Sequence, residues 1–204
     1  MRRIYYIGGS PCCGKSTFAE MIVAKYGFRY FKVDDFLEDY MARGVGAGKP
    51  LISEYAGMTL DEIWLRDPTV QNDEERKLYR EMFAFVQEDL RKLTGEAPIV
   101  TEGAAFLPEL MGETGVDKTN YICVVPTHGF QYETYAQRPW VTEYLAGCSD
   151  TKRAFENWMK RDYLFADMVL RDAERRGYAT LVVDGTKSAA DNLSHIETVF
   201  NLSK

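Results

Sequence analysis

The feature that most constrains the fold is a loop bracketed by glycines near the start of the chain. The short apolar run at residues 4–7 leads toward it, and the loop reads Gly9-Ser10-Pro11-Cys12-Cys13-Gly14-Lys15-Ser16. A helical pattern follows over residues 15–26 and stops at Gly27, since glycine readily takes the left-handed backbone that ends helices. A strand, a glycine loop and a helix in this order predict the first βα unit of an α/β fold.

Four more short apolar runs follow, at residues 30–33, 99–100, 121–125 and 181–183. Most of them lack alternation, which is typical of strands buried on both faces of a parallel sheet. Helical patterns lie between them, including a long one over residues 151–176 that ends at Gly177. Because parallel strands need right-handed crossovers, the sequence predicts an α/β three-layer sandwich with a five-stranded parallel sheet.

The length of 204 residues predicts a single domain over 1–204. Two long segments interrupt the alternation of strands and helices. Residues 36–97 are predicted to bind an acceptor molecule, and residues 127–152 to form a lid. The spacing of Thr59 with Glu62 and of Asn72 with Glu75 predicts two capping boxes, the second of which opens a helix that Gly95 stops.

A second glycine-rich stretch, residues 44–50, lacks a hydroxyl residue after Lys49, and its Pro50 is interpreted as incompatible with a helix start. It is therefore predicted to be a flexible loop beside the acceptor site. The aromatic residues of 36–97 are interpreted as core in the first place and as a substrate platform in the second; they are Tyr55, Trp64, Tyr79 and Phe83.

Composition narrows the classes of function and the cellular setting. The net charge of −6 argues against a nucleic-acid binder, which needs basic residues against phosphates. The four cysteines form no CxxC pair and the sequence has only two histidines, so a structural zinc site is not expected. The same use of cysteine predicts a reducing, cytoplasmic setting. Apolar runs are too short for a signal peptide or a membrane span. Nothing in the sequence indicates an oligomeric state.

The loop matches the pattern G-x-x-x-x-G-K-[ST] through Gly9, Gly14, Lys15 and Ser16. In such a loop successive backbone N–H groups converge on phosphate oxygens, and the following helix adds its positive end. The pattern predicts ATP and Mg²⁺ as cofactors: Lys15 reaches the β- and γ-phosphates and Ser16 ligates the metal. The predicted nucleotide contacts are Gly9, Ser10, Pro11, Cys12, Cys13, Gly14, Lys15, Ser16 and Thr17. The alternative is an ordinary turn with an incidental Lys-Ser pair.

Two acidic positions follow predicted strands, where ligands of open α/β sheets bind. Asp34 is predicted to orient an acceptor hydroxyl and take its proton, while Asp35 caps the next helix. The sequence does not decide whether Asp34 or Asp35 is the base. Glu102 is predicted to hold Mg²⁺ through water or to contact the acceptor, with a helix-start acid as the alternative.

The last long helix carries Arg161 on the same side as Trp158 and Phe165. An arginine in this setting is a candidate clamp on the transferring phosphoryl group. The competing explanations are an ion pair with Asp162 or Asp167, and snorkelling of the side chain.

Four further residues are weaker candidates for nucleotide contacts. Arg138 and Arg153, in and after the lid, are possible phosphate ligands. Gly185 and Thr186 follow the fifth strand and are predicted to pass beneath the purine base. An ordinary strand-to-helix turn is the alternative for the second pair.

Together these parts resemble the small P-loop kinases, a group with nucleoside, nucleotide, shikimate and gluconate kinases and the chloramphenicol phosphotransferases. The resemblance covers the whole length as an order of parts, although only the phosphate loop is highly specific. It implies the P-loop NTP hydrolase fold with strand order 2-3-1-4-5. Asp34 looks like the hydroxyl-activating acid and Arg161 like the lid-side arginine of that group. Residues 102–105 and 158–162 are similar to uncharacterised members.

The chain departs from the group's pattern in two ways that put a nucleotide acceptor in doubt. The lid lacks a dense arginine cluster, and residues 36–97 carry no nucleotide-monophosphate signature. Both departures favour a neutral hydroxyl acceptor. The resulting prediction is an ATP-dependent kinase acting on a hydroxyl of a small molecule: a nucleoside, a sugar-like metabolite or an antibiotic. The alternatives are a regulatory nucleotide switch without an acceptor and a polynucleotide end kinase.

Overall fold

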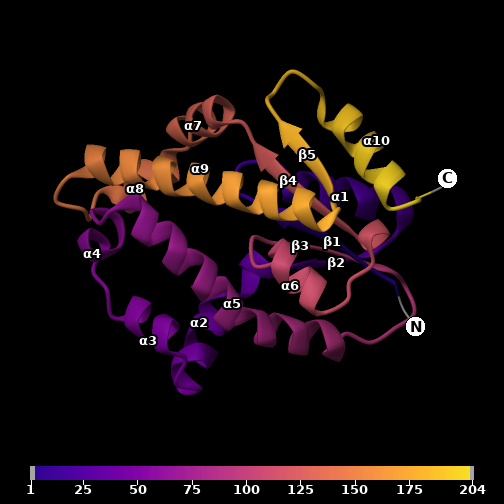
Figure 1. Cartoon of the computed structure of the whole chain (residues 1–204), viewed down its shortest axis with the longest axis horizontal. Helices are drawn as coiled ribbons and strands as arrows, with labels where there is room; N and C mark the ends of the chain where they lie inside the picture. Colours follow the sequence, from indigo (N-terminus) through magenta and orange to yellow (C-terminus); the bar gives the residue numbers. More distant parts are fainter. Residues whose placement is uncertain (1–2, 203–204) are drawn as a thin grey trace.

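The computed structural model describes residues 3–202, which fold around one parallel sheet (Figure 1). The strand order is β2-β3-β1-β4-β5, with every neighbouring pair parallel, so both the predicted fold class and the predicted order are confirmed. The strands are β1 (Ile4–Gly9), β2 (Arg29–Lys32), β3 (Ile99–Glu102), β4 (Tyr121–Pro126) and β5 (Ala179–Val183).

Helices cover both faces of the sheet and make two separate cores. α1 (Lys15–Tyr26) and α10 (Ala189–Val199) pack on the face to which Tyr5 and Ile7 point. α5 (Pro68–Lys92), α6 (Pro108–Glu113) and α9 (Thr151–Arg176) cover the face to which Tyr6 points. Alternate residues of β1 thus enter opposite layers, as a fully covered parallel sheet requires.

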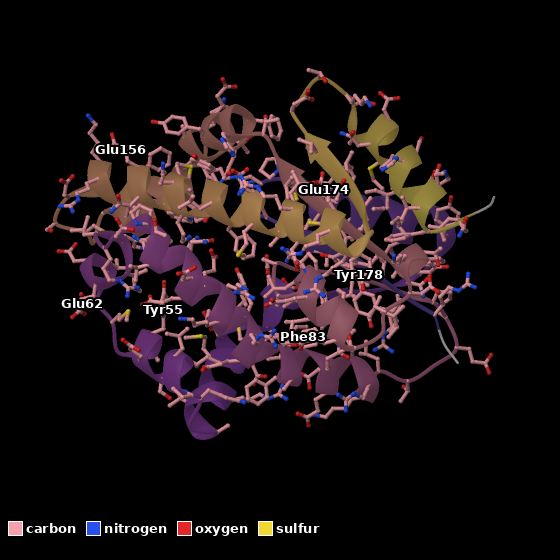
Figure 2. All side chains as sticks on the ribbon, viewed as in Figure 1. Tyr55, Glu62, Phe83, Glu156, Glu174 and Tyr178 are labelled. Carbon is pink, nitrogen blue, oxygen red and sulfur yellow. The ribbon has the colours of Figure 1, made fainter. Side chains whose placement is uncertain are left out.

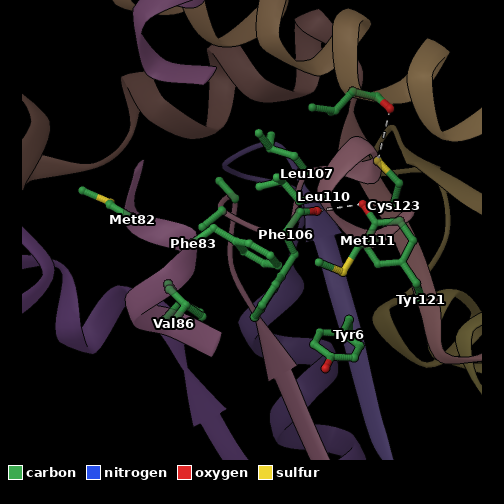
Figure 3. Packing of buried hydrophobic residues seen from close by; sticks show 14 of the residues in the cluster. Tyr6, Met82, Phe83, Val86, Phe106, Leu107, Leu110, Met111, Tyr121 and Cys123 are labelled. Atoms are coloured by element: carbon green, nitrogen blue, oxygen red, sulfur yellow. Dashed lines mark hydrogen bonds between the residues drawn. The ribbon is translucent and has the colours of Figure 1, made fainter. Parts of the chain in front are cut away.

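The core on the α5, α6 and α9 side is dense (Figure 3). Phe83 of α5 and Leu110 of α6 pack there around Phe106, which is fully buried. Tyr121 of β4 donates its hydroxyl to the Phe106 carbonyl at 2.9 Å. The bond satisfies a polar group inside an apolar layer and fixes the segment that leaves β3.

Two long excursions leave the sheet, and they correspond to the two long segments that the sequence predicts, 36–97 and 127–152. Between β2 and β3 the chain forms η1 (Val33–Phe36), α2 (Leu37–Gly46), α3 (Pro50–Ala56), α4 (Leu60–Trp64) and α5. Between β4 and α9 it forms α7 (His128–Ala136) and α8 (Pro139–Leu145), and η2 (Lys118–Asn120) precedes β4. The first excursion projects from one end of the sheet, and α8 and the start of α9 lie beside α4 (Figure 1). No helix within residues 3–202 has the length and apolarity to cross a bilayer.

The helix ends confirm some predictions and correct others. α1 ends at Gly27 and α9 at Gly177, both in left-handed backbone, and Thr59 with Glu62 forms a capping box. The second predicted box is wrong: α5 begins at Pro68, and Asp67 caps it by accepting from the Thr69 N–H at 2.8 Å. Asn72 and Glu75 therefore lie inside α5, because a capping aspartate followed by proline starts the helix a turn earlier.

Only part of the stretch 44–50 is the predicted loop: residues 44–46 end α2, and residues 47–49 form a short turn before α3. Gly44 is a buried residue of α2, where an added Cβ would lie 2.5 Å from Ile52 Cδ1. Pro50 is the first residue of α3 rather than a barrier to it, since the first helical N–H needs no partner within the helix. Glycine here lets two helices approach closely.

Candidate functional site

The glycine loop turns sharply at the carboxyl edge of the sheet. Gly9, Cys12 and Gly14 have positive φ values of 116°, 62° and 84°. A Cβ on Gly9 would lie 1.8 Å from the Val124 carbonyl oxygen, so no other residue fits there. Cys12 adopts the left-handed region without being glycine, at a cost on the order of 1 kcal/mol. A strained loop held between β1 and β4 is typical of a preorganised ligand cradle.

Lys15 opens α1 and folds its side chain back over this loop. Its Nζ donates to the Ser10 carbonyl at 2.7 Å, and the residue is buried. Burial by itself lowers the pKa of Lys15, but the surrounding Cys13, Glu102 and Asp34 raise it above its ordinary value. The ammonium therefore stays charged, beside the loop's backbone N–H groups and the positive end of α1.

The two predicted metal ligands lie together. Ser16 Oγ donates to Glu102 Oε1 at 3.0 Å, and the Tyr30 hydroxyl donates to the same oxygen at 2.9 Å. Burial raises the pKa of Glu102, and the Lys15 ammonium opposes the rise. A hydroxyl and a carboxylate are hard oxygen donors of the kind Mg²⁺ prefers, and two of them leave the remaining positions to water and phosphate. The donor set fits the predicted ion.

Asp34 and Asp35 differ in their surroundings. Asp34, in η1 directly after β2, acts electrostatically on both Lys15 and Glu102, so it lies at the edge of the sheet that carries the loop. Asp35 instead pairs with Lys32, with 3.6 Å between Nζ and Oδ1. It caps no helix: Phe36 precedes α2 and makes no side-chain cap, so the assignment of Asp35 to a cap is wrong.

Arg161 is held by carboxylates rather than left free. Its Nε and Nη2 donate to Asp162 Oδ1 at 2.8 and 2.5 Å, and Nε lies 3.3 Å from Glu75 Oε2. Its Cζ lies 4.6 Å from the centre of the Trp64 ring. The ion pair with Asp162, one of the competing explanations, is therefore present, whereas Asp167 contacts His128 and Arg171.

The turn of α9 that carries Arg161 also contacts the glycine loop. The Ser10 hydroxyl donates to the Asp162 carbonyl at 3.4 Å. Arg161 is thus one residue from a direct contact with the loop, while its own guanidinium faces the excursion between β2 and β3.

The weaker candidates occupy different surroundings. Arg138 lies over the Tyr135 ring at 5.2 Å, and it opposes the burial that raises the pKa of Cys12 to about 11, so it is close to the loop. Arg153 is exposed on the first turn of α9. Gly185 and Thr186 form an exposed turn after β5, in which the Thr186 N–H and hydroxyl both donate to Asp184 Oδ1, at 2.9 and 2.7 Å. Thr17 is exposed on α1.

A cavity of about 410 Å³ opens between the first excursion and the lid, residues 127–152. Tyr55 extends into this region from α3 (Figure 2). Three of the four aromatic residues interpreted first as core line it, namely Tyr55, Trp64 and Tyr79; Phe83 belongs to the core. Sequence reasoning missed the lining residues Glu75, Trp140 and Tyr144, which come from α5 and α8. No spacing rule links such distant positions.

Comparison with known proteins bears on the fold alone. No family model matches the chain, and neither does any curated protein sequence. Among solved structures, TT1252 from Thermus thermophilus is similar over 100% of this chain and 99% of its own, with 17% identity and a TM-score of 0.52. The likeness to TT1252 agrees with the α/β fold and the five-stranded parallel sheet described above. A gluconokinase from Sinorhizobium meliloti 1021 is also similar, with 14% identity, a TM-score of 0.49, and 98% and 91% of the two chains covered.

Proposed function

We propose that this protein is a kinase that transfers the γ-phosphoryl group of ATP to a hydroxyl group of a small molecule. The observation that carries the proposal is the grouping of Lys15, Ser16 and Glu102 at the mouth of the glycine loop. A fixed ammonium, a hydroxyl and a buried carboxylate beside a cradle of N–H groups match the needs of phosphoryl transfer.

The nucleotide would bind with its phosphates in the loop. Lys15 would exchange its bond to the Ser10 carbonyl for one to a phosphate oxygen, which costs little because Nζ moves within a single charged pocket. Ser16 would hold Mg²⁺ directly, and Glu102 would hold it through water. The ion, when bound, would neutralise phosphate charge and orient the γ-phosphoryl group.

Asp34 would act as the base. It would accept the proton of the acceptor hydroxyl as that oxygen forms its bond to the γ-phosphorus and the bond to the bridging β–γ oxygen breaks, leaving ADP. Its exposure in η1 leaves it accessible to an acceptor, in contrast to buried Glu102. The role of Arg161 as a clamp on the moving group stays a prediction, because Asp162 and Glu75 hold its guanidinium at the end of the cavity that faces the first excursion.

Turnover measurements on paired variants test this function. Lys15→Ala is expected to abolish ATP turnover and to weaken ATP binding, since it removes the buried ammonium. Asp34→Asn is expected to lower kcat by about 10²–10⁴ while the Kd for ATP, measured by calorimetry, stays nearly constant.

Asp35→Asn is the matched control, because Asp35 is the adjacent exposed carboxylate and pairs with Lys32. It should leave turnover unchanged. Parallel loss of ATP binding and turnover in Asp34→Asn would contradict the role of a base.

A further inference from the structure

The cavity between the first excursion and the lid is lined by aromatic and aliphatic side chains. The lid side supplies aromatic residues, which are Trp140 and Tyr144 of α8 and Trp158 of α9. The first excursion supplies the aliphatic Leu37, Met41, Leu78 and Met82 and three further aromatic residues, Tyr55, Trp64 and Tyr79. Trp140 and Tyr144 are 48% and 42% exposed, which is unusual for such large rings. A slot lined by aromatic rings and flexible aliphatic side chains suits a flat ring.

The deep end of the slot is polar but already neutralised. The charged residues lining the cavity are Glu75 and Arg161, which are 7% and 8% exposed. Arg161 has two carboxylate partners, since Asp162 binds it in addition to Glu75. An anionic acceptor would therefore meet no unpaired cation, and it would approach two carboxyl groups.

A cationic acceptor is disfavoured for a related reason. The Trp64 ring, one of the indoles that line the slot, is stacked on Trp158 with 4.4 Å between ring centres. The Arg161 guanidinium lies against the same ring. A second cation would not have this ring as a partner, and the carboxylates of Glu75 and Asp162 are already paired with Arg161.

One polar atom at the deep end has no hydrogen-bond donor among the described residues. Glu75 Oε2 is buried and makes no hydrogen bond, because its contact with Arg161 Nε at 3.3 Å lacks hydrogen-bond geometry. Glu75 Oε1 accepts from the Tyr79 hydroxyl at 3.3 Å. A buried acceptor without a donor is costly, so a ligand that brings an N–H or O–H group there is favoured.

We infer that the acceptor is an uncharged hydroxyl compound with a planar heteroaromatic ring, which stacks on Trp140 and Tyr144 and donates a hydrogen bond to Glu75. The inference rests on the proposed function, because it names the acceptor class for that site. The ring end would lie deep in the slot. The hydroxyl end would point toward Asp34. Burial and Glu75 are larger causes of the raised pKa of Tyr79, and Asp34 lies near enough to Tyr79 to add to the rise.

Tryptophan fluorescence reads this slot directly, since the chain's 3 tryptophans all line it. Uridine and inosine, each with a ring N–H, would be titrated without nucleotide, against ribose and gluconate. At least one ring compound is expected to give a saturable change below about 1 mM, the upper end of usual KM values, while ribose and gluconate give none. Tighter binding of ribose or gluconate, or no binding of either ring compound, would overturn the inference.

Matched variants localise the effect. Trp140→Leu and Tyr132→Leu both remove lid aromatics that are 48% exposed, but only Trp140 lines the slot. By calorimetry, Trp140→Leu should weaken binding of the ring compound by about fivefold or more, as loss of base stacking usually does, and Tyr132→Leu by less than about twofold. Equal effects would count against the slot.

Glu75→Gln tests the hydrogen bond. The parent protein should prefer the ring compound over its N-methylated derivative by about tenfold, and Glu75→Gln should reduce that preference. Circular dichroism spectra checked beforehand separate misfolding from lost recognition, and an unchanged preference in a folded variant would remove Glu75 from the site.

The two proposals can fail separately. Binding of a ring compound without any phosphoryl transfer would support the slot and contradict the proposed kinase function. Phosphoryl transfer to ribose or gluconate, but not to the ring compounds, would support the kinase function and contradict the assigned class of acceptor.

Discussion

At the scale of single residues, Glu75 links the proposed acceptor slot to the stability of the fold. Burial raises the pKa of Glu75 from its ordinary value of 4.5 to about 7, with Asp162 adding to the rise and Arg161 opposing it. The folded chain therefore binds this proton more tightly than the unfolded chain does. The resulting stability is fully present below about pH 4.5 and is lost as the pH rises through about 7.

Glu75→Gln is expected to remove this dependence. The free energy of unfolding of the parent, measured with urea, should fall between about pH 5 and about pH 8 by no more than about 3 kcal/mol, and the variant should show a flatter profile. Glu133→Gln, an exposed position of α7, is the control and should follow the parent. The assignment would be wrong if the free energy of unfolding of the parent instead rose between about pH 5 and about pH 8 and Glu75→Gln removed that rise.

The same scale shows how far the sequence predicts the site. Lys15, Ser16 and Glu102 were predicted together, because a motif of known spacing and the ends of adjacent strands converge by topology alone. Glu75 was instead interpreted as part of a capping box. Its contact with Arg161 joins positions in α5 and α9 that only the packing of those two helices brings together.

At the scale of elements, the lid is fastened to the first excursion. Asp61 of α4 accepts from the Ser149 N–H at 2.8 Å, and this bond lowers the pKa of Asp61. A Cβ on Gly147 would lie 2.6 Å from Leu60 Cδ1, so the two segments also pack closely. Trp64 of α4 and Tyr144 of α8 also touch, with 6.1 Å between ring centres, and both line the slot, so the junction adjoins it.

Asp61→Ala is expected to loosen the lid without disturbing the loop. The KM for the acceptor should rise severalfold while the Kd for ATP stays constant, because the lost bond holds only the acceptor side. Limited proteolysis should show faster cleavage within residues 127–152.

Asp117→Ala serves as the control, since Asp117 makes the same kind of bond, to the Thr119 N–H at 2.8 Å, far from the lid. Identical proteolysis of the two variants would show that the Asp61 bond does not fasten the lid.

Element ends were predictable where a single residue decides them. Gly27 and Gly177 end helices because left-handed backbone favours glycine, and both predictions are confirmed. Prolines were harder to interpret. Pro50 and Pro68 begin helices, whereas the sequence alone suggested a break at the first and overlooked the second. A proline can end a helix or occupy the first position of one, and which of the two occurs depends on the residues that pack around it.

At the scale of the whole molecule, one turn of α9 joins the loop to the slot. Asp162 receives the Ser10 hydroxyl through its backbone and holds the Arg161 guanidinium through its side chain. α9 packs on both α5 and α4, so the sheet, the first excursion and the lid share this helix. A ligand in either site would therefore contact a part of the molecule that also contacts the other site.

Thermal unfolding in the presence of ligands tests whether the molecule has both sites. A non-hydrolysable ATP analogue with Mg²⁺ at about 100 times its Kd should stabilise the fold by about 2.7 kcal/mol, which raises the Tm by about 5–11 °C for a chain of this size. A ring-bearing acceptor should raise the Tm on its own and add to the effect of the analogue. In Lys15→Ala the increment from the analogue should disappear while that from the acceptor remains, since the slot does not include Lys15. A regulatory switch without an acceptor would respond to the analogue alone, so the absence of any acceptor increment across the panel of ring compounds would favour that alternative over a kinase.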